Sequence, residues 1–247
     1  MIPKPANSTI GPSGIDLTSP DPTRQRPSRA YPYRIALGER YPDTAARLRA
    51  LWWFWWTDHA WIRAFWQNLD QVAPGVWRSN QPSPRRFARF RDMGIRTIIT
   101  LRGDSNLPHS IFEKNSCAHH GINLVPIHMR ARNLCDRQIY LELLDNFETL
   151  EKPFLMHCKS GADRVGLASA LYLLHIENAP LEQARKQLSL RYAHVRSFRT
   201  GILDFMLERY GEDISDRAMP IRDWIATEFD RKALTAEFEL RRSQGRF

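Results

Sequence analysis

From residue 72 onward, short runs of apolar residues alternate with longer stretches whose apolar positions recur at helical spacing. The predicted strands span residues 75–79, 95–101, 122–127 and 153–157. The predicted helices span residues 82–91, 110–119, 136–150, 164–176, 180–190, 197–210 and 219–229. Because strands and helices alternate, the sequence predicts an α/β fold with a central, mostly parallel sheet flanked by helices.

The chain divides by composition into four predicted parts. Residues 1–42 hold eight of the sixteen prolines and few residues that could build a core, which predicts a disordered or loosely attached arm. Residues 43–71 form a tryptophan-rich helical segment, and residues 72–215 form the main α/β domain. Residues 216–247 are expected to add a helical extension at the C-terminal side of that domain.

The tryptophan-rich segment, residues 43–71, has three interpretations. It holds six of the eight tryptophans, and Asp43 and Asp58 are expected to cap two short helices. The aromatic side chains could dock the segment onto the main domain. They could instead lie at a membrane interface, with arginines beside them, or form a face that binds a partner protein.

The residues that suggest chemistry follow the strand at 153–157. The chain runs from this strand into Cys158-Lys159-Ser160-Gly161-Ala162-Asp163-Arg164 and then into a helix. A tight loop that opens a helix directs backbone N–H groups inward, which makes a phosphate-binding site at the positive end of the helix dipole. The same field would favour the thiolate form of a cysteine at the start of the loop. An arginine at its end can hold two phosphate oxygens.

This His-Cys-x5-Arg pattern between a strand and a helix resembles the protein tyrosine phosphatase and dual-specificity phosphatase superfamily. The stretches 76–82 and 94–103 resemble the beginning of compact, atypical bacterial-type members. The resemblance covers roughly residues 72–210. It implies hydrolysis of phosphomonoesters in two steps, with attack by Cys158 and a phosphocysteine intermediate. Phosphate would be bound by the loop, residues 159–164, and no cofactor or metal is implied.

The acid that protonates the leaving oxygen is harder to assign. Members of the superfamily commonly supply an aspartate from a loop about thirty residues before the cysteine, but residues 127–133 contain no carboxylate. Asp163, directly before the motif arginine, resembles an acid proposed in related lipid phosphatases, and we prefer it to Asp136. Val165 also stands where a serine or threonine usually follows the arginine. This replacement is expected to slow hydrolysis of the phosphocysteine intermediate.

Charge and cysteine content narrow the partners. The formal charge of +9 favours anionic substrates, and Arg130, Arg132 and Arg196 are expected to contact a substrate with more than one anionic group. The expected substrate is a phosphorylated protein or a phosphoinositide, without specific binding of nucleic acid. Three scattered cysteines and the absence of an apolar leader predict a cytoplasmic protein, at most peripheral to a membrane.

Two other functions stay open at this point. Related folds also support RNA 5′-triphosphatase activity, which the positive charge would fit. The missing upstream aspartate and Val165 would also fit a phosphate-binding module that has lost turnover. Cys117, His119, His120 and His128 match no common spacing of zinc ligands, so no metal site is predicted.

Overall fold

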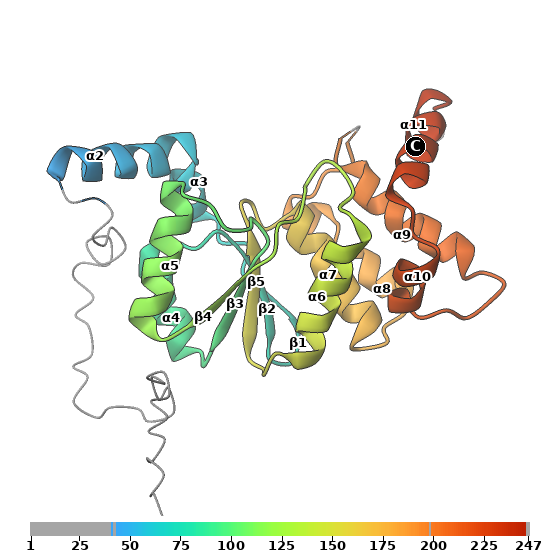
Figure 1. The fold of residues 1–247 in the computed structure, drawn as a ribbon, viewed down its shortest axis with the longest axis horizontal. Helices are drawn as coiled ribbons and strands as arrows, with labels where there is room; N and C mark the ends of the chain where they lie inside the picture. Colours follow the sequence, from blue (N-terminus) through green and yellow to red (C-terminus); the bar gives the residue numbers. More distant parts are fainter. Residues whose placement is uncertain (1–40, 42, 198, 246–247) are drawn as a thin grey trace, which may run out of the picture. The chain divides into compact units, whose positions relative to one another are not determined.

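The computed structural model describes residues 41, 43–197 and 199–245, all within the unit formed by residues 31–247. The predicted N-terminal arm, residues 1–42, lies outside the described residues apart from Tyr41. Five strands form one sheet, with helices on both of its faces (Figure 1). The α/β fold predicted from the sequence is therefore confirmed.

The sheet has the strand order β1-β2-β5-β3-β4. Its strands are β1 (Asp70–Ala73), β2 (Val76–Asn80), β3 (Thr97–Thr100), β4 (Asn123–Pro126) and β5 (Phe154–Cys158). Strand β1 pairs with β2 in the antiparallel sense, and the other pairs are parallel. The pattern analysis missed β1, a four-residue strand at the edge of the sheet. Because β2, β3 and β5 are parallel, their carboxyl ends meet at one edge, where the phosphate loop begins.

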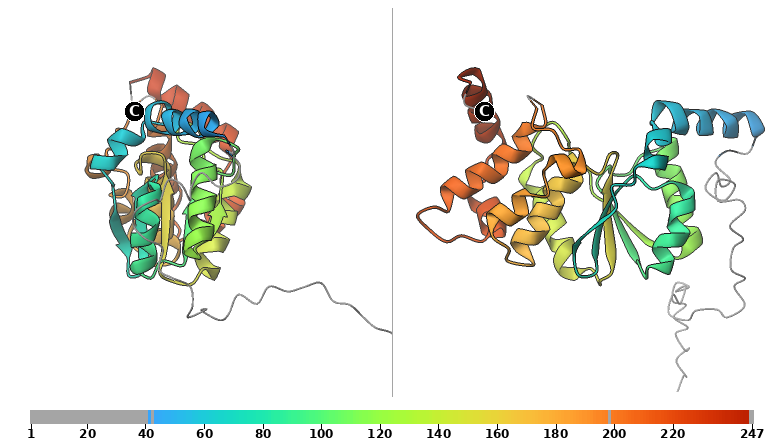
Figure 2. Two further views of the ribbon diagram at one scale, coloured as in Figure 1. Left: turned by 90° about the vertical axis from the view of Figure 1, so that its left-hand side faces the viewer. Right: turned by 180° about the vertical axis from the view of Figure 1, so that it is seen from behind.

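Alternate residues of the central strands feed two apolar layers. Ile98 and Leu155 pack with α4 (Pro84–Asp92) and α5 (Pro108–His120) on one face. Their neighbours Ile99 and Met156 point to the other face, which is covered by α6 (Arg137–Thr149) and α7 (Asp163–His175). Figures 1 and 2 show the two pairs of helices on opposite sides of the sheet. This period of two is what a sheet buried on both faces requires.

The C-terminal third adds helices outside α6 and α7. They are α8 (Leu181–Arg185), α9 (Gly201–Asp213), α10 (Ile221–Thr227) and α11 (Arg231–Ser243), with a 3-10 turn at Leu190–Tyr192. The predicted helix at 180–190 is shorter than expected, because the chain leaves α8 and enters this turn. Trp224 and Phe229 are fully buried in the larger core, so α10 and the residues after it are part of the domain.

The tryptophan-rich segment forms α2 (Thr44–Trp52), a π-helical turn at Trp53–Thr57, and α3 (Ala60–Phe65). Phe54, Ala50 and Ala60 pack against Phe112 of α5, and Trp53 stacks on a histidine of the same helix. The opposite face exposes large aromatic side chains: Trp52, Trp56, Trp61 and Phe65. The segment therefore docks on the domain through part of its aromatic residues and leaves the rest exposed.

Of the two predicted caps in this segment, one is confirmed. The Asp43 side chain accepts a hydrogen bond from the Ala46 N–H at 2.6 Å, as an N-cap does. The prediction for Asp58 is wrong, because its carboxylate is buried among arginine side chains and His59 occupies the N-cap position of α3. Over the described residues, no helix is long and apolar enough to cross a membrane.

We expect Phe54→Ala to lower the free energy of unfolding by about 3 kcal/mol or more, because it empties a fully packed contact with Phe112. Replacing the exposed Trp52, Trp56 and Trp61 with alanine should change it by less than about 1 kcal/mol. Urea unfolding followed by circular dichroism measures both. Equal losses in the two variants would contradict this account of how the segment docks.

Candidate active site

The predicted phosphate loop connects β5 to α7, as the sequence indicated. Cys158 is the last residue of β5, and its Sγ accepts a hydrogen bond from the Gly161 N–H at 3.3 Å. Gly161 has a φ of 75°, and a Cβ there would lie 2.8 Å from the Asn80 backbone nitrogen. Glycine therefore permits both the left-handed turn and the close approach of the loop to β2.

The outward side of the loop is held by donors from elsewhere in the chain. The backbone N–H of Gln81 donates to the Lys159 carbonyl at 3.2 Å. The Asn68 side-chain amide donates to the carbonyls of Ser160 and Gly161, at 3.2 and 2.9 Å. Arg78, which has no exposed surface, also donates to the Gly161 carbonyl, at 2.8 Å.

Arg78 connects the loop to the C-terminal part of the domain. Its guanidinium lies 3.6 Å from the centre of the Tyr192 ring and donates to the backbone carbonyl of Gln187 at 3.0 Å. Burial lowers the pKa of Arg78 to about 10, so the side chain stays charged at neutral pH. A fixed positive charge thus lies behind the loop that carries Cys158.

Arg164, at the end of the loop, is poised between protein and solvent. One terminal nitrogen of its guanidinium donates to the Leu101 carbonyl at 3.3 Å. Its Nε is buried and has no hydrogen-bond partner among the described residues. An unpaired buried N–H is costly, so the arrangement favours an anion that accepts from it.

A buried contact between a histidine and a glutamate lies beside Cys158. His157, directly before Cys158, contacts Glu113 of α5 through Nε2, and neither side chain is exposed to any useful extent. Burial alone would raise the pKa of Glu113, but the charge and hydrogen bond of His157 outweigh it and hold the pKa below its usual value. The pair fixes the end of β5 where the loop begins.

The tryptophan-rich segment contributes Asp58 to the same region. The Asp58 carboxylate accepts hydrogen bonds from Arg102 at 2.8 and 3.2 Å and from Arg63 at 2.5 Å. The ammonium group of Lys159, next to Cys158, lies 3.6 Å from it. Burial would raise the pKa of Asp58, yet Arg102 and Arg63 together lower it to about 2.

Asp163, the preferred acid, is the first residue of α7 and contacts a buried histidine. Its Oδ1 lies 2.7 Å from Nδ1 of His194, whose Nε2 lies 2.9 Å from Asp204. Burial would lower the pKa of His194, but its hydrogen bonds with the two carboxylates outweigh this and raise the pKa to about 9. The structure thus places a protonated imidazole in contact with the carboxylate before Arg164.

Asp136, the alternative acid, lies in a different setting. It occupies the N-cap position of α6, but its side chain makes no capping hydrogen bond. It pairs instead with Arg231 of α11 at 3.0 Å and is 67% exposed. The structure therefore gives Asp136 no contact with the phosphate loop.

The three arginines expected to bind substrate are not brought together. Arg196 pairs with Glu208 of α9 at 2.8 Å, which commits its guanidinium to the protein. Arg130 is exposed and lines a cavity of about 470 Å³ beside α11, together with Arg231 and Lys232. Arg132 is exposed in the same loop. Among the residues that the structure describes, no group of three or more His, Cys, Asp or Glu side chains could hold a metal ion.

The sequence analysis missed several residues of the site, among them Asp58, Asn68, Arg78 and Glu113. Each is polar, buried and distant in sequence from the loop that it supports. A weak signal was present for two of them. Asp58 is the only acidic residue between Asp43 and Asp70, in an aromatic stretch, and Arg78 occupies a central position of a short strand.

The α/β fold and the loop from Cys158 to Arg164 agree with what the motif predicted, and sequence comparison gives the family. Residues 72–202 match the model of the Swiss Army Knife protein, dual-specificity and protein tyrosine phosphatase (DSP-PTPase) domain. The chain belongs to this family, which confirms the superfamily indicated by the motif.

Curated relatives include the dual-specificity protein phosphatase TpbA of Pseudomonas aeruginosa, 23% identical over 123 residues. The match covers 49% of this chain and 53% of TpbA, so the chain spans about half the length of the curated relatives it matches. Similar solved structures include TpbA with phosphotyrosine, with a TM-score of 0.42 at 21% identity, covering 49% of this chain and 71% of that chain. The catalytic domain of the PP-IP phosphatase Siw14 from S. cerevisiae gives 0.47 at 17% identity, covering 62% and 95%.

We expect the charge on His194 to make stability depend on pH. Because the folded pKa of about 9 exceeds the ordinary value of 6.5, the contribution is complete below pH 6.5 and is lost as the pH rises through 9. After a discount for solvent screening, the loss should be about 2 kcal/mol. Urea unfolding at pH 6.5 and 9.5 measures it, with His194→Gln as the control. A variant that shows the same loss would contradict the assignment.

Proposed function

We propose that this protein hydrolyses phosphomonoesters through a phosphocysteine intermediate on Cys158. The main support for this proposal is the combination of two features of the loop from Cys158 to Arg164. The Gly161 N–H donates to the cysteine sulfur, and the Nε–H of Arg164 is buried without a hydrogen-bond partner in the described part of the chain. A phosphate group bound in the loop could accept hydrogen bonds from the backbone N–H groups and from the Arg164 guanidinium.

In the first step the Cys158 thiolate attacks phosphorus, an S–P bond forms, and the bond from phosphorus to the leaving oxygen breaks. The loop N–H groups and Arg164 hold the equatorial oxygens as charge redistributes. In the second step water attacks the same phosphorus, the S–P bond breaks, and phosphate leaves. Val165 is fully buried in the core and offers no hydroxyl for this second step. Within the loop, Ser160 Oγ accepts from the Ala162 N–H at 3.3 Å.

The proton for the leaving oxygen is assigned to Asp163, with Asp136 as the alternative. The proton starts on Nδ1 of His194, 2.7 Å from Asp163, and passes through the Asp163 carboxyl to the leaving oxygen, which leaves the imidazole neutral. Asp136 is paired with Arg231 on the surface and has no such neighbour in contact. These settings support Asp163 for this role.

The substrate classes proposed are phosphorylated proteins, with tyrosine or dual specificity, and phosphoinositides. TpbA, a relative, has been crystallised with phosphotyrosine, which supports the first class. The exposed Trp52, Trp56 and Trp61 support peripheral contact with a membrane, which the second class would need. The triple alanine variant should then lose sedimentation with anionic vesicles.

The three cysteines are unpaired thiols, which supports a reducing, cytoplasmic location.

Replacing Cys158 with serine should abolish turnover of an aryl phosphate and leave binding of inorganic phosphate largely intact, because the alcohol is not ionised at neutral pH. Arg164→Lys should also be severely impaired, since a point charge cannot replace the planar fork. Turnover that vanadate blocks would exclude a pure binding module, and RNA 5′-triphosphate substrates test the other alternative. Cys117→Ser, at a buried position of α5, is the matched control and should keep its activity. If the Cys158→Ser protein keeps a tenth or more of the wild-type activity, Cys158 is not the nucleophile.

Asp163→Asn should lower the maximal rate with an alkyl phosphate by about 10²–10⁴-fold, the usual contribution of a positioned acid. The loss should shrink with an aryl phosphate, whose leaving group needs the proton less. Asp136→Asn should leave both rates nearly unchanged. Steady-state kinetics of both variants on both substrates decide between them. If Asp163→Asn slows both substrates equally, its role is to position Arg164; if only Asp136→Asn shows the leaving-group dependence, Asp136 is the acid.

A further inference from the structure

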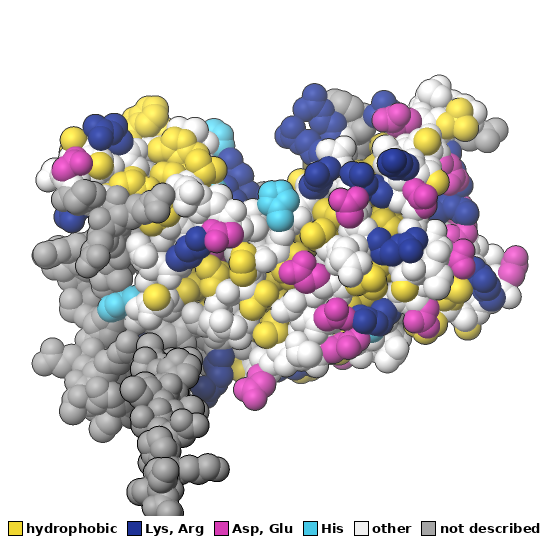
Figure 3. All heavy atoms as spheres, in the orientation of Figure 1, with side chains coloured by type: hydrophobic (Ala, Val, Ile, Leu, Met, Phe, Trp, Pro, Cys, Tyr) yellow, Lys and Arg dark blue, Asp and Glu magenta, His cyan; other side chains and the backbone are white. Residues whose placement is uncertain are grey.

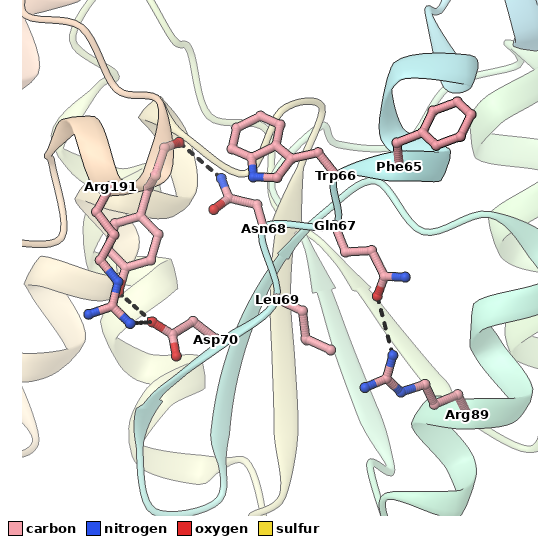
Figure 4. Close-up of a pocket in the computed structure, with 9 residues that line it drawn as sticks. Phe65, Trp66, Gln67, Asn68, Leu69, Asp70, Arg89 and Arg191 are labelled. Carbon is pink, nitrogen blue, oxygen red and sulfur yellow. Dashed lines mark hydrogen bonds and ion pairs between the residues drawn. The ribbon is translucent and has the colours of Figure 1, made fainter.

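A groove of about 490 Å³ lies beside the phosphate loop, along the residues that connect α3 to β1 (Figure 4). Phe65 and Trp66 lie at its upper end, and Asp70 lies where β1 begins. Its volume falls within the range of about 300–1,000 Å³ that is typical of ligand sites. No step of the proposed mechanism uses the groove.

The groove shares residues with the support of the active site. Asn68, in its floor, donates to the Ser160 and Gly161 carbonyls and also to the Tyr192 carbonyl at 3.0 Å. Asn68 has a φ of 50°, a conformation that asparagine tolerates better than most residues. The floor of the groove is therefore in direct contact with the outer side of the phosphate loop. Ser160 and Gly161 of the loop therefore separate the groove from the side of the loop that faces the Cys158 sulfur.

Two arginines face each other across the groove. Arg89 of α4 donates to the Gln67 side chain at 3.3 Å on one wall. Arg191 pairs with Asp70 at 2.9 Å on the other wall, yet 72% of its side chain is exposed. Figure 4 shows the two guanidinium groups on opposite sides of residues 67–70. With two arginines and one aspartate, the groove carries an excess of positive charge.

The upper end of the groove is aromatic and open. Phe65 is 90% exposed, and Trp66 beside it is also exposed. Exposed aromatic rings next to arginines are typical of the residues that dominate binding between proteins. A small polyanion would use the arginines but would gain little from the rings. The hydrophobic side chains that α2 presents are visible at the upper left of Figure 3, on the same side of the molecule as the carboxyl edge of the sheet.

We propose that this groove binds the polypeptide that flanks the phosphorylated residue of a protein substrate, and that it selects acidic flanks. Acidic side chains of the substrate would lie opposite Arg89 and Arg191, and an apolar one would pack on Phe65 and Trp66. The proposal rests on the proposed function, because it places a phosphorylated residue in the loop at Cys158. It narrows the substrate class to acidic phosphoproteins.

Binding to Cys158→Ser protein tests the groove without any need for turnover. Fluorescent phosphotyrosine peptides with glutamate or with lysine flanks are titrated at low salt and followed by anisotropy. We expect the acidic peptide to bind about 10-fold or more tightly than the basic one, by attraction to the two arginines. Adding Arg89→Gln and Arg191→Gln should reduce this ratio to less than about 3-fold, and salt should do the same.

The matched control is Arg96→Gln, an exposed arginine before β3, at the opposite end of the sheet from the loop. It should leave the ratio unchanged. Equal binding of both peptides, or an unchanged ratio in the double variant, would overturn the groove. The proposal would also be overturned if the double arginine variant lost binding to phosphoinositide vesicles but kept its binding to the acidic peptide.

Turnover separates this proposal from the proposed function. In protein that keeps Cys158, Arg89→Gln and Arg191→Gln together should leave the rate of hydrolysis of a small aryl phosphate within about twofold of the unsubstituted rate. This substrate has no flanking residues that the groove could bind. No aryl phosphate turnover in the natural chain would reject the proposed function, while the peptide titration would still decide on the groove.

Discussion

The phosphate loop depends on one constraint: N–H groups that turn inward leave their carbonyls turned outward, into the protein. A buried carbonyl without a donor is costly, so the loop is stable only if other parts of the chain supply donors. Gln81, Asn68 and Arg78 supply them for three successive carbonyls. The N–H groups of the loop can therefore turn inward because the opposite side of the loop is hydrogen-bonded.

These donors come from elements that the fold brings to one edge. Gln81 follows the end of β2, and Asn68 precedes β1, which pairs with β2. Arg78 lies within β2 and contacts Tyr192 from the C-terminal part. The parallel pairing of β2 with β5 places all of them beside the residues that follow Cys158. The order of the strands thus determines which donors reach the loop.

Local patterns in the sequence were sufficient for most of the fold. The strand before Cys158, the glycine at 161 and the helix after it are neighbours in the chain, and their composition directly indicates a phosphate loop. The supporting residues were not predictable in the same way. Asn68 and Gly161 are 93 positions apart, and Arg78 and Gly161 are 83 apart, so only the folded sheet reveals their contact.

The errors have related physical causes. Asp58 before a short helix reads as a cap, but tertiary ion pairs with Arg63 and Arg102 bury it instead. β1 was missed because four residues at a sheet edge carry too few positions to establish a period of two. Both outcomes were decided by contacts that form only in the folded chain: ion pairs for Asp58 and pairing with β2 for β1.

Asp58 and Asn68 support the loop from outside the part of the chain that matches the family. Similarity to the family starts at residue 72, after both residues. Yet one of them pairs with Arg102 beside the loop, and the other holds two of the loop's carbonyls. A fragment that begins at residue 72 would lose the ion pair of Arg102 with Asp58 and the Asn68 donor to the Ser160 carbonyl, while the Gly161 carbonyl would keep Arg78. The part of the chain that matches the family and the part that holds the loop in place therefore begin at different residues, and the aromatic segment belongs to the second.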